Sequence, residues 1–184
     1  MTERKAIKYY PTRSRLLHWS MAILIISMLL VGLSMVKSLA VWQPVALSLH
    51  KSFGVLLLLL LVIRLVNKYL TPRPRLPKKM PDLQKRVARL SHFTLYAAML
   101  LMPLSGWLMQ SADGRSVNVF GWFTLPQLLD ANIKAYAIFR ELHAWIAWLL
   151  ILTIALHVLG ALYHGLIRQD RVLASMLYSK KPKG

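Results

Sequence analysis

The 184-residue chain contains no cysteine. Disulfide bonds, thiolate-bound zinc and cysteine-bound iron–sulfur clusters are therefore excluded, because each of them needs a cysteine sulfur. The C-x-x-C-H signal for covalent haem attachment is excluded for the same reason. Any haem in this chain must therefore be held by non-covalent ligation.

Acidic residues are also scarce in this chain. The chain has six Asp and Glu residues against 24 Lys and Arg, which gives a formal net charge of +18. The acid nearest to a long apolar segment is Glu141, at the edge of one of them. Metal and proton transporters normally carry carboxylates within such segments, so the pattern disfavours this class. The serines likewise lack the acidic or cysteine partner pattern of a nucleophilic enzyme.

Hydrophobic residues, in contrast, make up 57% of the chain, and its mean hydropathy is +0.48. This is too apolar for a soluble domain of this size. Four segments reach the roughly 20 residues that a helix needs to cross a hydrocarbon layer about 30 Å thick. They are residues 16–36, 45–66, 90–110 and 142–167. We therefore predict an all-α membrane protein, a four-helix up-down-up-down bundle that forms one domain over residues 1–184.

The basic residues are distributed unevenly. All but five of the 24 lie in the N-terminal arm, around the connection between the second and third segments, or in the tail. The positive-inside rule then places both termini in the cytoplasm. The cluster Arg73–Lys79 is expected to bind anionic lipid headgroups, and nucleic acid is not expected as a partner. The first apolar run is longer than the 7–15 residues typical of a signal peptide, so we expect an uncleaved anchor.

The longest connection on the outer side spans residues 111–136 and is partly apolar. Its apolar side chains are Val119, Phe120, Trp122, Phe123 and Leu125. We expect this connection to lie across the mouth of the bundle, partly in the membrane interface. An ordinary amphipathic loop without a function is the alternative.

Six histidines lie in or at the ends of the four segments, and the inferred topology sorts them into two levels. The outer pair is His50 and His143, and the inner group is His18, His92, His157 and His164. Ionisable residues inside a membrane are costly and mark functional sites. Hydrogen bonding between helices would explain one or two histidines, but a set arranged in two layers needs a further reason.

A fourteen-residue interval recurs in every segment, and it corresponds to a rise of about 21 Å on nearly the same face of a helix. Each helix therefore places one residue of such a pair at each of the two levels. The interval separates His143 from His157, His18 from Gly32, His92 from Gly106, and His50 from Arg64.

The glycines and the arginine at these positions suit a flat macrocycle inside the bundle. Gly32 and Gly106 remove side chains where a ring would press against backbone, and Gly54 lies one turn from His50. Arg64, a costly charge within the second segment, would pair with a haem propionate. The alternatives are that the glycines only permit close helix contact and that Arg64 extends to the headgroups.

Opposed imidazoles at two heights predict two non-covalent b haems, each with two axial histidines. For the outer haem we expect His50 and His143. The inner haem has His18 and His157 as candidates, with His92 and His164 as nearby competitors. Two axial histidines leave no open position at the iron, so such sites transfer electrons. The remaining two histidines would serve a quinone, as hydrogen-bond or proton donors, or would orient propionates.

Four stretches of the sequence resemble the helices of the prokaryotic cytochrome b561 family. They are RSRLLHW (13–19), LHKSFGVLLLLLLVIRL (49–65), LSHFTLYAAMLLMPLSGWLM (90–109) and ELHAWIAWLLILTIALHVLGALYH (141–164). The resemblance covers nearly the whole chain. It implies that His18 with His157 holds one haem and that His50 with His143 holds the other.

The same resemblance implies a di-haem oxidoreductase that passes electrons between the periplasmic side and the quinone pool. Superoxide is a candidate donor and ubiquinone a candidate acceptor, and Lys51 and Arg140 are among the outer basic residues that would attract a small anion. One alternative is a haem-bearing subunit that relays electrons for a partner oxidoreductase, as in hydrogenase or formate dehydrogenase complexes. The other is a haem-free membrane protein with structural histidines.

Overall fold

The computed structural model describes residues 9–37, 40–72, 74 and 80–178. Most of the predicted lipid-binding cluster, residues 73 and 75–79, therefore lies outside the described residues, as do residues 1–8 and 179–184. The elements in chain order are α1 (Thr12–Lys37), α2 (Gln43–Leu70), α3 (Asp82–Ala112), β1 (Val117–Val119), β2 (Phe123–Leu125), α4 (Ile133–Leu162), the π-helix η1 (Tyr163–Ile167) and α5 (Arg171–Leu177).

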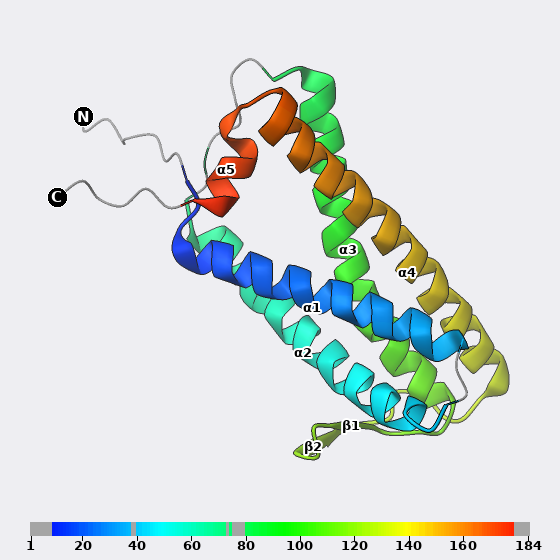
Figure 1. Ribbon diagram of the computed structural model, residues 1–184. Helices are drawn as coiled ribbons and strands as arrows, with labels where there is room; N and C mark the ends of the chain where they lie inside the picture. The colour runs from blue at the N-terminus through cyan, green and yellow to red at the C-terminus, as the bar shows by residue number, and fades with distance from the viewer. Residues whose placement is uncertain (1–8, 38–39, 73, 75–79, 179–184) are drawn as a thin grey trace.

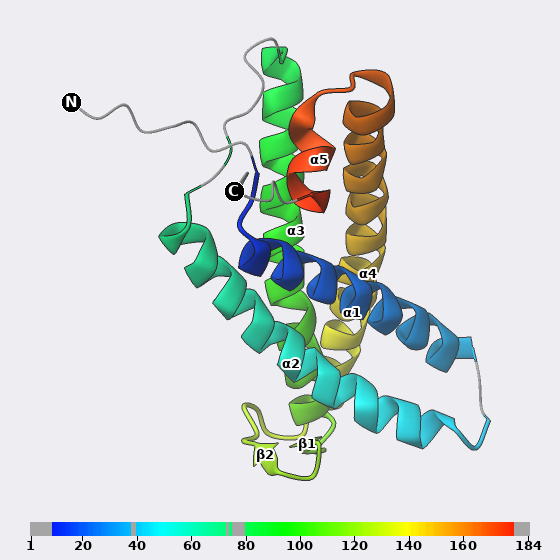
Figure 2. The ribbon, with the colours of Figure 1, turned by 60° about the vertical axis from the view of Figure 1, so that its left-hand side comes forward.

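The four long helices form two antiparallel pairs, α1 with α2 and α3 with α4 (Figures 1 and 2). Each is long and apolar enough to cross a membrane. Many large apolar side chains on them point outward; Ile23 is 66% exposed and Trp145 is 70% exposed. Soluble proteins rarely expose an apolar surface of this extent to water, whereas the hydrocarbon of a membrane solvates such a surface. The prediction of an all-α, four-helix multi-pass membrane protein is confirmed.

The helices extend beyond the apolar segments that predicted them. α3 begins at Asp82 rather than at residue 90, and α4 begins at Ile133 rather than at residue 142. The cause at α4 is Asn132, whose side-chain oxygen accepts hydrogen bonds from the backbone N–H groups of Lys134 and Ala135. Hydropathy marks the part of a helix that lies in hydrocarbon, whereas a capping residue sets where the helix starts.

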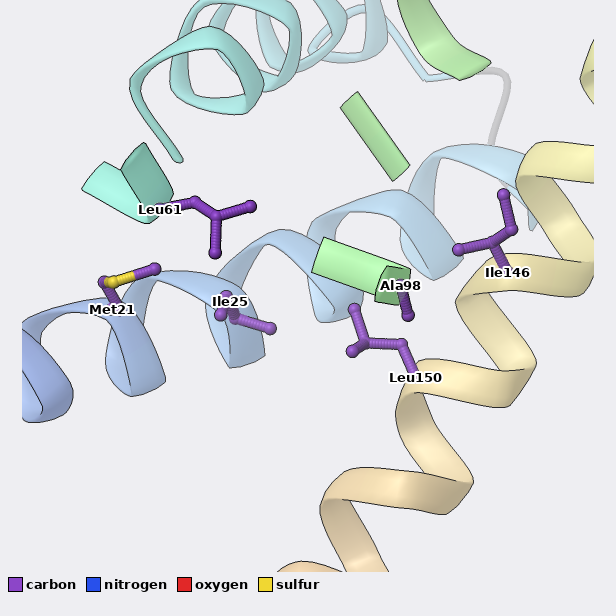
Figure 3. Close-up of a cluster of buried hydrophobic side chains, with 6 residues drawn as sticks. All are labelled: Met21, Ile25, Leu61, Ala98, Ile146 and Leu150. Carbon is purple, nitrogen blue, oxygen red and sulfur yellow. The ribbon is translucent and has the colours of Figure 1, made fainter. Parts of the chain in front are cut away.

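A small apolar core joins all four helices (Figure 3). It consists of Met21, Ile25, Leu61, Ala98, Ile146 and Leu150. Every one of these residues falls inside one of the fourteen-residue intervals, between the residue that marks one level and the residue that marks the other. The core is therefore an apolar layer between the two histidine levels.

The connection between α3 and α4 carries a β-hairpin, which the sequence interpretation did not predict. β1 and β2 pair antiparallel, with Val119 opposite Phe123. The turn has positive φ at Phe120 (51°) and Gly121 (78°), and the N–H of Trp122 donates to the carbonyl of Val119. Positive φ at both central residues is typical of the type I′ turn that suits a hairpin's twist.

Ser52 fastens the hairpin to α2. Its hydroxyl oxygen accepts from the N–H of Phe120 at 3.1 Å and lies 3.3 Å from the carbonyl oxygen of Asn118. Ser52 is 2% exposed, and the Phe53 and Phe120 rings meet edge to face with centroids 5.2 Å apart. The hairpin thus lies against the end of α2 that carries His50, and it contributes the buried side chains of Val117 and Val119 there.

The opposite end is closed by η1 and α5. The N–H of Arg168 bonds to the carbonyl of Tyr163, which is the i to i+5 pattern of a π-helix. Gly165 lets α5 approach, because a Cβ at this position would overlap the side chain of Leu173. α5 then reaches the start of α1, where the N–H of Tyr10 donates to the carbonyl of Ser175.

Candidate functional site

The outer histidine pair is assembled by α2 and α4. The ring centroids of His50 and His143 lie 6.4 Å apart, with the ring planes at 69°. Nδ1 of His143 is 3.0 Å from the hydroxyl oxygen of Ser105 on α3. Nδ1 of His50 is buried and has no hydrogen-bond partner among the described residues. Two imidazoles from helices far apart in sequence therefore lie next to each other at this level.

Gly32 and Gly106 lie against this outer pair. A Cβ on Gly106 would be 3.2 Å from Cε1 of His143, and a Cβ on Gly32 would be 3.4 Å from Cε1 of His50. The first distance is tighter than ordinary contact, and the second is within it. These glycines therefore give room to the imidazole rings themselves. Gly54, also predicted to give clearance, has no atom within 4 Å of an added Cβ.

The inner level brings together three histidines from three helices. His18 on α1 and His157 on α4 have ring centroids 6.3 Å apart, with the planes at 88°. His92 on α3 is nearer to His157, with centroids 5.4 Å apart. Nδ1 of His92 donates to the carbonyl of Ala88 at 2.6 Å. Of the two predicted competitors, the structure thus places His92 beside His157.

His164 has a different partner. Its Nδ1 donates to Oδ2 of Asp170 at 2.6 Å, and both side chains are mostly buried. The other oxygen of Asp170 accepts from the N–H of Val172 and so caps α5. One carboxylate therefore orients the imidazole and also fixes the short helix that closes the inner end.

Arg64 lies on α2, and its Nε donates to the hydroxyl of Tyr96 on α3 at 3.2 Å. Lys68 lies one turn further along α2, with Nζ 4.2 Å from the centroid of the same ring. This arrangement keeps Arg64 within the bundle. Its pairing with a propionate stays a prediction.

The outer basic residues are partly engaged. Nζ of Lys51, which follows His50, is 3.5 Å from Oε1 of Gln110. Arg140 is exposed on α4, three residues before His143. Arg115 pairs with Asp113 at 2.8 Å, so its charge is compensated locally. Lys51 and Arg140 therefore remain the residues to test for attraction of an anion.

Three polar residues at these sites were missed by the sequence analysis: Ser52, Ser105 and Asp170. Ser105 directly precedes Gly106, and Asp170 follows His164 by six residues, so both stand near positions that the spacing did select. Their partners lie on other elements or across the π-helix, and no helical period predicts such contacts. The sequence did contain one indication of Ser105: it is a polar residue inside an apolar helix, directly before Gly106.

Comparison with known proteins places this sequence in a family. The family model described as "Prokaryotic cytochrome b561" matches residues 9–179. The chain is 38% identical over 172 residues to "Cytochrome b561 homolog 2" of Escherichia coli (strain K12), which covers 91% of this chain and 90% of that protein. It is 28% identical over 132 residues to "Cytochrome b561 homolog 1" of the same organism, with 72% and 74% covered.

A third relative is more distant. It is "Probable superoxide oxidase CybB" of Yersinia pestis, 26% identical over 140 residues, with 76% of this chain and 79% of that protein covered. The family match spans all four long helices and both histidine levels. The chain belongs to the prokaryotic cytochrome b561 family, whose members are membrane electron-transfer proteins that generally bind haem b.

Proposed function

We propose that the chain holds two b haems, one at each histidine level, and passes electrons between the periplasmic surface and the quinone pool of the bacterial inner membrane. The observation that carries this proposal is the equal spacing of the two imidazole pairs, 6.4 Å at the outer level and 6.3 Å at the inner. The ligands would be His50 with His143 and His18 with His157.

That spacing fits a single metal ion between two imidazoles. Two imidazole nitrogens that bound one metal ion from opposite sides, each at about 2.0–2.1 Å, would place the ring centroids about 6.3 Å apart, since each nitrogen lies about 1.1 Å from its centroid. The separation of His92 from His157, 5.4 Å, is too short by this measure. His92 is also oriented by its bond to the Ala88 carbonyl. The spacing therefore favours His18 over His92 as the inner partner of His157.

When bound, each haem would supply one-electron transfer, because two histidine ligands would leave no open position at the iron. The chain's own contribution is to hold the rings at fixed heights and to keep water away. Met21, Leu61, Ala98 and Leu150 fill the layer between the two levels with apolar atoms, each 3% exposed or less. The buried hairpin residues Val117 and Val119 cover the outer level.

The orientation in the membrane follows from charge. The end that carries η1, α5 and the start of α1 is the end where the basic residues concentrate, so we assign it to the cytoplasm. The hairpin, Lys51 and Arg140 then face the periplasm. A positive outer surface would steer a small anion toward His50, and superoxide is our candidate donor. A relative named as a probable superoxide oxidase supports this choice of candidate.

Rapid mixing tests this function directly. We expect superoxide to reduce the oxidised, purified chain and ubiquinone to reoxidise it, with both steps visible in the Soret band. A Soret band that responds to neither reagent would contradict the proposed pathway. Activity that requires a co-purifying catalytic subunit would instead favour the relay subunit for a partner oxidoreductase.

At the cytoplasmic end, His164 is our candidate for proton transfer to a quinone. Asp170 holds Nδ1–H of His164, which leaves Nε2 as the atom that accepts or returns a proton. His92 is the second candidate at this level.

We expect His164→Gln to slow quinone reduction about 100-fold, the usual scale of a lost acid–base group, with the haem spectrum unchanged. Asp170→Asn should have a smaller effect in the same direction, because an amide oxygen can still accept from Nδ1–H of His164, although it lacks the negative charge of the carboxylate. Single-turnover oxidation of the pre-reduced chain by ubiquinone is the measurement. A wild-type rate in His164→Gln would exclude this residue from the proton path.

A further inference from the structure

We infer that Ser105 is a positioning residue for His143, and that it makes His143 the more strongly donating imidazole of the outer pair. The inference rests on the proposed function, since it concerns a haem held by His50 and His143. Ser105 lies on α3, whereas the two proposed ligands lie on α2 and α4. Through Ser105, a third helix therefore contributes a polar contact to the outer level.

The hydrogen bonds of Ser105 fix the tautomer of His143. The hydroxyl donates its one hydrogen to the carbonyl of Met102 at 2.8 Å. At 3.0 Å from Nδ1 of His143, the same oxygen can then only accept. The carbonyl of Met102 is a second acceptor for the His143 ring, and a carbonyl can only accept. Nδ1 must therefore carry the hydrogen, and a neutral imidazole with hydrogen on Nδ1 has its lone pair on Nε2. Nε2 is the nitrogen left to bind a metal.

Burial and the neighbouring glycine make this arrangement specific. Ser105 is 3% exposed, so water does not compete for its hydroxyl. Gly106 follows it, and a Cβ there would be 3.5 Å from the same Nδ1 and 3.2 Å from Cε1. The absent side chain of Gly106 lets the ring approach α3, and the hydroxyl of Ser105 then holds its Nδ1–H.

The outer pair is consequently asymmetric. Nδ1 of His50 is buried without a hydrogen-bond partner among the described residues, whereas Nδ1 of His143 has an acceptor. An acceptor on the far nitrogen of a metal-bound imidazole raises the basicity of that ligand. A more basic ligand stabilises ferric iron over ferrous iron. Ser105 therefore holds the reduction potential of the outer haem below the value that it would have without this bond.

The test is redox potentiometry of the purified full chain in detergent, with Ser105→Ala compared with Ser105→Thr. The outer haem is identified as the component that is lost in His50→Ala. We expect Ser105→Ala to raise the potential of the outer haem by a tenfold change in the ferric-to-ferrous ratio, about 59 mV for one electron. The inner haem should keep its potential, and Ser105→Thr should keep both potentials because it retains the hydroxyl.

Ser175→Ala is the matched control. Ser175 is 5% exposed, and its hydroxyl donates to the carbonyl of Val172 at 2.7 Å, the same i to i−3 bond that Ser105 makes. It should shift neither potential.

An unchanged outer potential in Ser105→Ala, or an equal shift in Ser105→Thr, would overturn the inference. Loss of the outer haem from Ser105→Ala but not from Ser105→Thr would support it, and loss from both would overturn it. A wild-type chain without haem at the outer level would refute the proposed function instead, so the two failures are distinguishable.

Discussion

Replacing His143 by Ala is expected to remove the outer haem and to leave the inner haem in place. His50→Ala should remove the same haem, because the centroids of the two rings lie 6.4 Å apart and the two residues would share one iron. His157→Ala should remove the other haem, since its ring is paired with His18 at the inner level. Haem b content and redox difference spectra of the purified variants measure this, with a fall from about two haems per chain to about one.

His164→Ala is the control for this series. His164 lies in η1 and bonds to Asp170, so both haems should remain. If His143→Ala kept both haem signals, or if His50→Ala and His143→Ala removed different haems, the assignment of the histidines to two levels would be wrong.

Gly106→Val is expected to have the second-largest effect, loss of most of the outer haem from a chain that still folds. A Cβ at Gly106 already lies 3.2 Å from Cε1 of His143, and the two further methyl groups of valine enlarge the overlap with the ring. Overpacking of this kind typically costs about 1–3 kcal/mol, which corresponds to about a 5- to 150-fold loss of affinity. Haem titration followed in the Soret band would measure the change at the outer level.

Two other glycines calibrate that result. Gly160 lies on α4, is exposed, and has no atom within 4 Å of an added Cβ, so Gly160→Val should retain both haems. Gly32→Ala should be milder than Gly106→Ala, because its added Cβ would be 3.4 Å from His50. Equal effects of valine at Gly106 and at Gly160 would show that close approach of the ring to α3 has no role in haem binding.

The fold was predictable from the sequence because its strongest signals are long-range averages. Four apolar segments of membrane-spanning length predict four helices, and the structure contains them. The ends of the helices were not predictable from hydropathy, since single residues such as Asn132 determine them through capping bonds. The β-hairpin was not predicted, because its turn, Phe120-Gly121, lacks the usual Asn-Gly or Asp-Gly pair.

The candidate site was predictable in its levels but not in its supporting contacts. The fourteen-residue interval places two residues on one face of a helix at two heights, and this is a property of the backbone alone. Which ring faces which depends on how the helices pack. The sequence could not separate His92 from His164 as neighbours of His157, whereas the packing of α3 against α4 does. Ser105 and Asp170 act through such tertiary contacts and were not found.

The central claim is that two irons are each held between opposed imidazoles, at two heights in one four-helix bundle. The most direct measurement combines haem quantification with electron paramagnetic resonance of the oxidised, purified full chain. The account predicts about two b haems per chain, both low-spin with two axial nitrogen ligands. A single haem, or a high-spin signal from a five-coordinate iron at either level, would contradict it.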